Sequence, residues 1–168
     1  EKMLYLQAQP NQAHLQLAKW EREGKIKGVI TQNIDGLHQK AGSQIVFELH
    51  GSVLRNYCTQ CHTFYDENYV MAADGVPVCK KCGGVVKPDV VLYGESLDDA
   101  VMRGAMHAIA HADLLIVGGT SLSVYPAAGL IDWYAGSRLV LVNRTPTPRD
   151  GRANLILRDP IGQVFQRL

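Results

Sequence analysis

The sequence predicts an α/β protein with a Rossmann-like, doubly wound parallel sheet and a small inserted zinc-ribbon module. Segments such as 114–117 and 138–142 are almost wholly apolar, which is typical of strands buried on both faces of a sheet. These segments alternate with stretches of helical periodicity, which indicates helices covering a parallel sheet. The insert is predicted at residues 52–94, which hold all four cysteines and show little helical periodicity.

The composition limits the classes of function. The chain has 168 residues, with 46% apolar and 20% charged, which suits one domain with a small insert and excludes a disordered chain. The net charge of +1 argues against direct binding of nucleic acid, which normally needs a basic excess. No apolar run approaches the roughly 18 residues of a transmembrane helix, so we expect no membrane partner.

The first third of the chain predicts one helix and two strands. Apolar residues at three- and four-residue spacing predict a helix over 12–24, with Asn11 as its N-cap and Gly24 as its stop. Residues 27–31 and 45–49 are short apolar segments that predict buried strands.

Regular structure returns after residue 94. Ser96 is followed three residues later by Asp99, a capping pattern that predicts a helix running to Ala112. Strands follow at 114–117, 138–142 and 154–157, Pro126 opens a short helix, and 161–168 predicts a terminal helix.

This order predicts two domains. Residues 1–51 and 95–168 form the Rossmann-like domain, and residues 52–94 form the zinc-binding module. Polar loops follow three of the strands directly. Because ligands of parallel sheets bind at the carboxyl ends of the strands, we expect these loops to meet at one crevice: 31–36, 118–123 and 143–145.

The four cysteines form two close pairs, Cys58/Cys61 and Cys79/Cys82. Two Cys-x2-Cys pairs separated by seventeen residues match the spacing of a tetrahedral zinc site, so we predict one structural zinc ion. Four thiolates leave no open position for a catalytic water. Two disulfides or a redox pair are the alternative, and His62 is a possible substitute ligand.

The chain contains neither the glycine-rich dinucleotide fingerprint nor a P-loop. It carries instead a set of ordered motifs, through which it resembles the sirtuin (Sir2) family of NAD-dependent protein deacylases from about residue 10 to its end. The motifs are Thr31-Gln-Asn-Ile-Asp-Gly-Leu-His38, Leu49-His-Gly51, the two cysteine pairs, Pro88-Asp-Val-Val-Leu-Tyr-Gly-Glu95, Gly119-Thr-Ser-Leu-Ser-Val-Tyr-Pro-Ala127 and Leu141-Val-Asn143.

The resemblance implies roles for individual residues. His50 matches the general base of the family. The role suits it, because imidazole titrates near neutral pH and can accept a proton from a ribose hydroxyl. The resemblance also implies that Asn33 acts with it in catalysis. The NAD site is implied for Gln32, Asn33, Ile34, Asp35, Gly119, Thr120, Ser121, Asn143, Arg144, Thr145 and Ile161. The substrate peptide is expected to add as a β-strand along Val91, Leu92, Gly94 and Glu95.

The family reaction starts with attack of the acyl-lysine carbonyl oxygen on C1′ of the nicotinamide ribose, which releases nicotinamide. With His50 as base, a ribose hydroxyl then attacks the resulting imidate, and water completes the reaction. The products are the free lysine and O-acyl-ADP-ribose, so NAD is consumed. The resemblance therefore implies acyl-lysine proteins or peptides as substrates, and we expect a cytoplasmic monomer.

The sequence departs from the family pattern in two ways. Tyr93 replaces the common Phe before Gly-Glu, and the N-terminal segment with the Gly-Ala-Gly-Ile-Ser phosphate loop is not present. We therefore expect the 168 residues to be inactive or weakly active by themselves. The alternatives are a mono-ADP-ribosyltransferase and a non-catalytic zinc-ribbon binding module.

Overall fold

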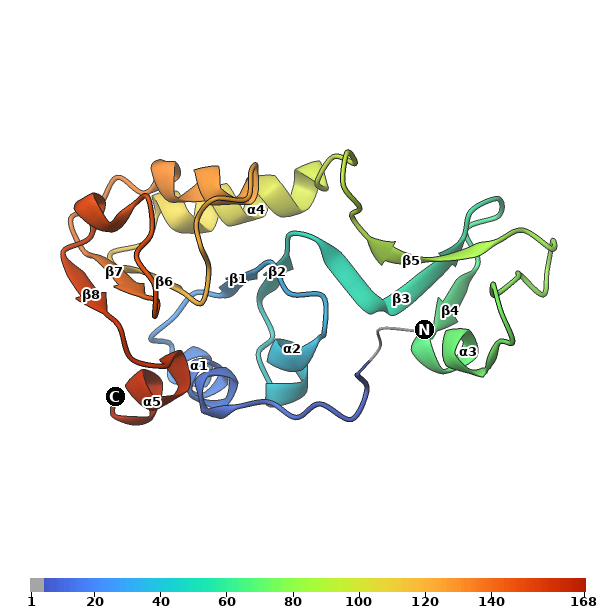
Figure 1. Cartoon of the computed structure of the whole chain (residues 1–168), viewed down its shortest axis with the longest axis horizontal. Coiled ribbons are helices and arrows are strands. Elements are labelled where there is room, and N and C mark those ends of the chain that lie inside the picture. The colour runs from blue at the N-terminus through green and yellow to red at the C-terminus, as the bar shows by residue number, and fades with distance from the viewer. Residues whose placement is uncertain (1–4) are drawn as a thin grey trace. The chain divides into compact units, whose positions relative to one another are not determined.

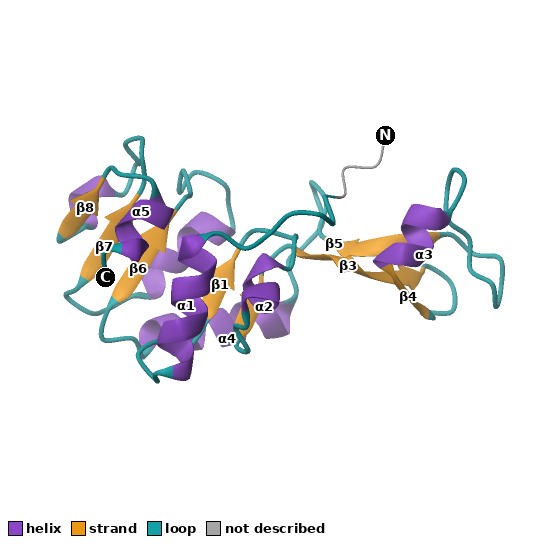
Figure 2. Cartoon of the chain, turned by 90° about the horizontal axis from the view of Figure 1, so that it is seen from below, coloured by secondary structure: helices purple, strands orange, loops and turns teal. Residues whose placement is uncertain are grey.

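The computed structural model describes residues 5–168, and these divide into two compact units. The two units, drawn in Figures 1 and 2, interleave along the chain. Unit 1 contains all four cysteines and is made of residues 5–8, 31–36 and 48–97. Unit 2 is made of residues 9–30, 37–47 and 98–168. Unit 1 is thus larger than the predicted insert, because the loop after residue 30 and the His50 segment belong to it.

Unit 2 contains the predicted parallel sheet. Its three strands are β6 (Leu115–Gly118), β7 (Leu139–Val142) and β8 (Leu155–Leu157), in the order β6-β7-β8. Both neighbouring pairs are parallel. The central strand β7 has three buried residues of four, as the apolar pattern predicts for a strand covered on both faces.

Helices lie on both sides of this sheet (Figure 1). α1 (Gln12–Arg22) and α5 (Ile161–Gln166) cover one side, and α4 (Asp99–Ala110) and the 3₁₀ helix η1 (Ala127–Trp133) lie on the other. The short helices α2 (Leu37–Ala41) and η2 (Asp150–Arg152) complete the unit. The core between α1, β7 and α5 consists of Ala13, Trp20, Val142, Val164 and Phe165.

The strands β1 (Val29–Thr31) and β2 (Val46–Glu48) pair with each other in a separate two-stranded sheet. Both are shorter than the predicted segments 27–31 and 45–49. The α/β class is confirmed, but these strands do not continue the β6-β7-β8 sheet.

Helix boundaries differ from the predicted ones. The predicted cap at Ser96 is wrong: α4 begins at Asp99, and the Asp98 carboxylate accepts a 2.8 Å hydrogen bond from the backbone N–H of Val101. Asp98 lies three residues before this free N–H group, and its charge also interacts favourably with the helix dipole. The terminal helix α5 ends at Gln166 rather than Leu168.

Unit 1 contains an antiparallel sheet in the order β4-β3-β5 (Figure 2). Its strands are β3 (Gly51–Cys58), β4 (Phe64–Asp66) and β5 (Val86–Val90). A short helix that the periodicity did not predict, α3 (Glu67–Ala72), follows β4 and packs against β3 and β4. Its N-cap is Asp66, which accepts from the N–H of Tyr69 at 2.8 Å.

Candidate active site and metal centre

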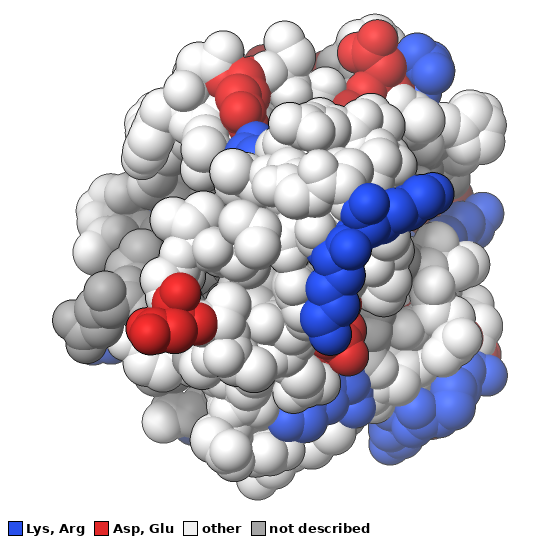
Figure 3. All heavy atoms as spheres, turned by 90° about the vertical axis from the view of Figure 1, so that its right-hand side faces the viewer, with Lys and Arg blue, Asp and Glu red and all other residues white. Residues whose placement is uncertain are grey.

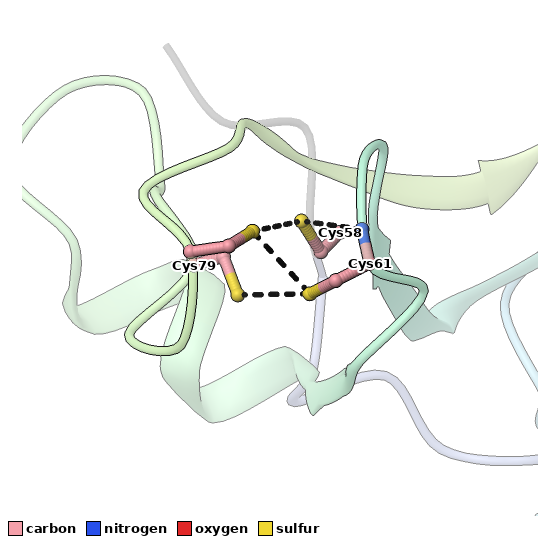
Figure 4. A group of neighbouring side chains, drawn as sticks. Cys58, Cys61 and Cys79 are labelled. Carbon is pink, nitrogen blue, oxygen red and sulfur yellow. Dashed lines mark hydrogen bonds between the residues drawn. The ribbon is translucent and has the colours of Figure 1, made fainter.

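The four cysteines come together in unit 1. Cys58 ends β3, Cys61 lies in the turn that follows, and Cys79 and Cys82 lie in the turn before β5. Figure 4 shows Cys58, Cys61 and Cys79 with their sulfur atoms pointing toward one another. All four Sγ atoms lie within 4.8 Å of one another, and all four residues are free thiols.

This geometry fits one zinc ion. Four sulfurs at about 2.3 Å from a tetrahedral ion lie about 3.8 Å apart. The Sγ atoms of Cys61 and Cys79 are 3.5 Å apart, and those of Cys58 and Cys82 are 3.4 Å apart. The alternative ligand His62 is exposed and is not part of the cluster formed by the described residues. The four cysteines are thus positioned to bind one zinc ion.

A tyrosine supports the second cysteine pair. The Tyr65 hydroxyl donates to Sγ of Cys79 at 3.1 Å and accepts from the N–H of Lys80 at 2.8 Å. Its hydrogen bond, the largest effect, and backbone N–H groups of the turn lower the pKa of the Cys79 thiol to about 6, which favours the thiolate that a metal needs. The Tyr65 ring also stacks on Tyr69 at a centroid distance of 4.4 Å.

His50 lies half-buried between β2 and β3. Nδ1 of its ring is 3.0 Å from the backbone carbonyl of Gln32. A carbonyl can only accept, so Nδ1 carries the proton and Nε2 has a free lone pair. The His50 carbonyl also accepts from the N–H of Val91 at 3.1 Å, which ties the segment to the end of β5.

The position directly after His50 requires a glycine for steric reasons. Gly51 has φ +75°, and its register partner on β5 is Val90. A Cβ at this position would collide with the carbonyl oxygen of Asp89. Only glycine therefore allows β3 to start this close to β5 directly after His50.

The loop after β1 lies beside His50 in unit 1. The hydroxyl of Thr31 accepts from the N–H of Asn33 at 3.0 Å, and the carbonyl of Ile34 accepts from the N–H of Val53 at 3.0 Å. Asn33 and Asp35 are exposed, whereas Gln32 is half-buried. Unit 1 thus brings the predicted residues 32–35 and His50 together.

The segment predicted to bind the substrate peptide, residues 91–95, lies directly after β5 and forms a turn closed by Glu95. Its carboxylate accepts from the N–H of Leu92 at 2.8 Å and from Nζ of Lys87 at 2.9 Å, and its own N–H donates to the Leu92 carbonyl at 3.0 Å. Lys87 and the Leu92 N–H both lower the pKa of Glu95. Gly94 has φ +86°, and the side chain of Tyr93 is fully exposed at the tip of the turn.

A shallow pocket of about 270 Å³ lies beside this turn within unit 1. Val91 and Glu95 line it together with Tyr57, His62 and Lys87. On the face seen in Figure 3, most atoms belong to uncharged residues, Lys and Arg side chains gather toward one side, and fewer Asp and Glu side chains lie among the rest.

In unit 2, the other two predicted loops follow the carboxyl ends of β6 and β7, at the same edge of the sheet. Gly119 has φ +65° and donates to the Val142 carbonyl at 3.1 Å. A Cβ at Gly118 would collide with Cδ1 of Ile161, which places Ile161 next to the first loop. The Thr120 hydroxyl accepts from the N–H of Leu122 at 3.3 Å.

The second loop of unit 2 is ordered by its own side chains. Nδ2 of Asn143 donates to the carbonyl of Thr145 at 2.9 Å and lies 3.3 Å from its hydroxyl. The Ser121 and Ser123 hydroxyls of the first loop are 2.5 Å apart. Unit 2 thus brings together Gly119, Thr120, Ser121, Asn143, Arg144, Thr145 and Ile161. The meeting of these loops with residues 31–36 stays a prediction.

Several residues at these sites were not predicted from the sequence. Arg55 donates to Glu48 at 2.6 Å and to Asp89 at 2.9 Å, which links the His50 segment to β5. Tyr65 and Arg158 likewise act through partners that are remote in the sequence. A single polar residue without a local motif carries no sequence signal for such contacts.

Within residues 5–168, no helix is long and apolar enough to cross a membrane.

Comparison with known proteins identifies the family. The model of the Sir2 family matches residues 1–126. The NAD-dependent protein deacetylase of Clostridium perfringens is 61% identical over 168 residues, which cover 99% of this chain and 69% of the relative. That of Clostridium acetobutylicum is 54% identical, with 99% and 68% of the two chains covered.

Comparison with solved structures also identifies the Sir2 family. A Sir2 protein with a p53 peptide and NAD+ has a TM-score of 0.90 at 42% identity, covering 96% of this chain and 70% of the other. Sir2 with the inhibitor EX-527, 2′-O-acetyl-ADP-ribose and a deacetylated p53 peptide has a TM-score of 0.90 at 44% identity, covering 96% and 71%. We conclude that this chain belongs to the Sir2, or sirtuin, family of NAD-dependent protein deacetylases.

Proposed function

We propose that this chain forms the catalytic core of an NAD-dependent protein lysine deacylase in which His50 is the general base. The observation that carries the proposal is the contact of His50 Nδ1 with the Gln32 carbonyl at 3.0 Å. This contact orients the ring and leaves Nε2 as an acceptor. Deacetylation is the reaction that the related proteins carry out by name.

His50 is suited to take a proton from a ribose hydroxyl. It is half-buried, and its backbone carbonyl is held by the N–H of Val91, so the ring has a defined place beside residues 32–35. Histidine is the side chain that most often serves as the base in such a transfer. Asn33 is exposed next to it, and we propose that Asn33 orients the ribose or the attacking water.

The residues proposed for NAD binding fall into two groups, one in each unit. In unit 1, Gln32, Ile34 and Asp35 are proposed to hold the nicotinamide end. In unit 2, Gly119, Thr120, Ser121, Asn143, Arg144, Thr145 and Ile161 are proposed to hold the adenosine end. NAD would supply the ribose whose C1′ the acyl oxygen attacks and whose hydroxyl receives the acyl group, and these residues would position it.

The zinc site is proposed to be structural and to define a module over residues 52–94. Four sulfur ligands fill a tetrahedral shell and leave no place for a water to be activated. Free thiols that serve as metal ligands are typical of a reducing compartment, which supports a cytoplasmic location.

The peptide substrate is proposed to add as a strand along Val91, Leu92, Gly94 and Glu95. The turn closed by Glu95 leaves Leu92 and Tyr93 exposed. A Sir2 structure with an acetylated peptide, 43% identical with a TM-score of 0.90, supports a peptide as substrate. Main-chain hydrogen bonds would supply affinity with little selectivity for sequence.

The test uses the full-length protein with NAD and peptides carrying acetyl-, succinyl- or long-chain acyl-lysine. Mass spectrometry should detect the free lysine peptide, nicotinamide and O-acyl-ADP-ribose in equal amounts. Transfer of ADP-ribose to the peptide without loss of the acyl group would instead establish the mono-ADP-ribosyltransferase alternative.

His50→Ala should lower kcat by about 100-fold or more, because general-base catalysis contributes about 10²–10⁴-fold. His107→Ala is the matched control, since His107 is an exposed histidine on α4 of unit 2. Activity of His50→Ala equal to that of the control would contradict the assignment of His50 as the base.

A further inference from the structure

Arg158 lies directly after β8 and contacts the backbone of the Asn143–Thr145 loop. One guanidinium nitrogen, Nη1, donates to the carbonyl of Asn143 and to the carbonyl of Thr145, both at 3.0 Å. The two carbonyls are thus held from one side by a single planar group. A guanidinium suits this task because its donors have a fixed geometry.

The other end of the guanidinium is held as well. Nη2 of Arg158 pairs with the Asp150 carboxylate, and the second oxygen of that carboxylate accepts from the hydroxyl of Thr147 at 2.8 Å and from its N–H at 3.1 Å. Thr147 is buried, so the network is anchored in the fold of unit 2. These contacts, those from Thr147 above all, lower the pKa of Asp150, which keeps it charged opposite Arg158.

The contacts determine which atoms Asn143 can offer to a ligand. Its N–H donates to the Leu157 carbonyl at 3.0 Å, its carbonyl accepts from Arg158, and its Nδ2 donates to Thr145. Nδ2 faces a carbonyl, which can only accept, so this assignment of the amide is required. Of the groups of Asn143, only Oδ1 is without a partner among residues 5–168, and it is an acceptor for a hydroxyl.

We propose that Arg158 is a positioning residue for adenosine-ribose binding: it holds the Asn143–Thr145 loop so that Oδ1 of Asn143 accepts from a ribose hydroxyl. This inference rests on the proposed function, which places NAD at the loop. Arg158 does not itself touch the ligand, and Asp150 fixes the orientation of its guanidinium.

The experiment measures ADP-ribose binding by calorimetry and the KM values for NAD and for acetylated peptide, all with the full-length protein. Arg158→Met keeps the aliphatic stem and removes every donor. We expect the Kd of ADP-ribose and the KM for NAD to rise about tenfold, as for the loss of charge-assisted hydrogen bonds. The KM for peptide should not change.

Two further variants separate positioning from general stability. Arg158→Lys keeps the charge opposite Asp150 but loses the planar fork, so it should recover only part of the lost affinity. Arg152→Met is the matched control, since Arg152 pairs only with Asp132 on the surface, among the described residues, and should bind ADP-ribose like the wild type. Should Arg158→Met not fold, Arg158→Lys carries the test alone.

Wild-type binding of ADP-ribose in Arg158→Met, or in Arg158→Lys if that variant carries the test, would overturn the inference. An equal rise of the KM values for NAD and peptide would also overturn it, because it would indicate a general defect. A wild-type protein that neither binds ADP-ribose nor deacetylates would instead refute the proposed function.

Discussion

The two units of this chain are stabilised in different ways. Unit 2 has a continuous apolar core in which α1 and α5 pack on the parallel sheet through Trp20, Val142 and Phe165. The buried cluster of unit 1 is Cys58, Cys79 and Val86, so two of its three members are cysteines of the predicted zinc site. A three-stranded antiparallel sheet with so small an apolar cluster has little core of its own, so we expect metal coordination to contribute much of its stability.

The two units also carry different groups of proposed site residues. Unit 1 carries His50, whose ring is held by a backbone carbonyl, and the segment after β5 that is proposed for the peptide. Unit 2 carries loops at the carboxyl ends of parallel strands, where nucleotides bind in such folds. The unit that contains the predicted zinc site thus also holds the proposed catalytic base and the segment proposed for the peptide.

Removal of zinc should have the largest effect, and only on unit 1. We expect Cys79→Ser or treatment with a chelator to remove amide protection over residues 48–97, because structural zinc contributes about 10 kcal/mol or more to folding of such modules. Hydrogen exchange read by mass spectrometry measures the two units separately. Thr59→Ala, an exposed change between two ligands, is the control, and equal loss of protection in unit 2 would contradict the comparison.

A cavity in the apolar core should instead destabilise unit 2 and leave the zinc site of unit 1 unchanged. Leu141 on β7 is 1% exposed, so Leu141→Ala should lower the unfolding free energy of unit 2 by about 2–5 kcal/mol. The zinc content should stay at one ion per chain. Leu155→Ala on the neighbouring strand, where the side chain is 49% exposed, should cost much less. Equal losses for the two variants would show that β7 is not the centre of the core.

Gly51→Ala tests the backbone that joins His50 to β3. Gly75 also has a positive φ, of +83°, but nothing lies within 4 Å of a Cβ placed there. We expect Gly75→Ala to cost about 1 kcal/mol of unfolding free energy for its dihedral angle alone. Gly51→Ala should cost about 1–3 kcal/mol more, because its Cβ collides with Asp89. Denaturant unfolding of both variants measures the difference, and equal costs would exclude the collision.

The smallest effect is expected for Tyr65→Phe, which removes the hydroxyl donor to Cys79 and keeps the ring. The hydroxyl lowers the pKa of Cys79, so its loss should raise that pKa and protons should compete with zinc at a higher pH. We expect zinc affinity to fall about tenfold and the pH of zinc release to rise, measured by transfer to a coloured chelator. Tyr57→Phe is the control, because the exposed Tyr57 lies outside the cluster around the cysteines. An unchanged release pH would mean that Tyr65 acts only through its ring.

Local patterns predicted much of this protein. The spacing of Cys58, Cys61, Cys79 and Cys82 predicted the metal cluster, since ligands on two tight turns need little else to meet. The apolar segments around Ile116 and Leu141 predicted parallel strands, which the structure contains. The family was predicted from ordered motifs and is confirmed by the Sir2 match.

Other features did not follow from the local sequence patterns. The cap of α4 is Asp98 rather than Ser96, because the register of the helix decides which side chain reaches Val101. Helix α3 is too short and too exposed to have a clear period. The strands β1 and β2 form their own sheet, which the apolar pattern of their residues does not determine.

By itself, the sequence determined the types of element, the metal ligands, the family and the residues proposed for the site. The tertiary structure decided how those residues are held: the tautomer of His50 through Gln32, the conformation of Gly51 beside Asp89, and the fork of Arg158 on the Asn143 loop. The physical reason is the range of the interactions. Ligand spacing and periodicity are local, whereas a hydrogen-bond partner 15 or more residues away is set only when the strands that carry both groups have packed.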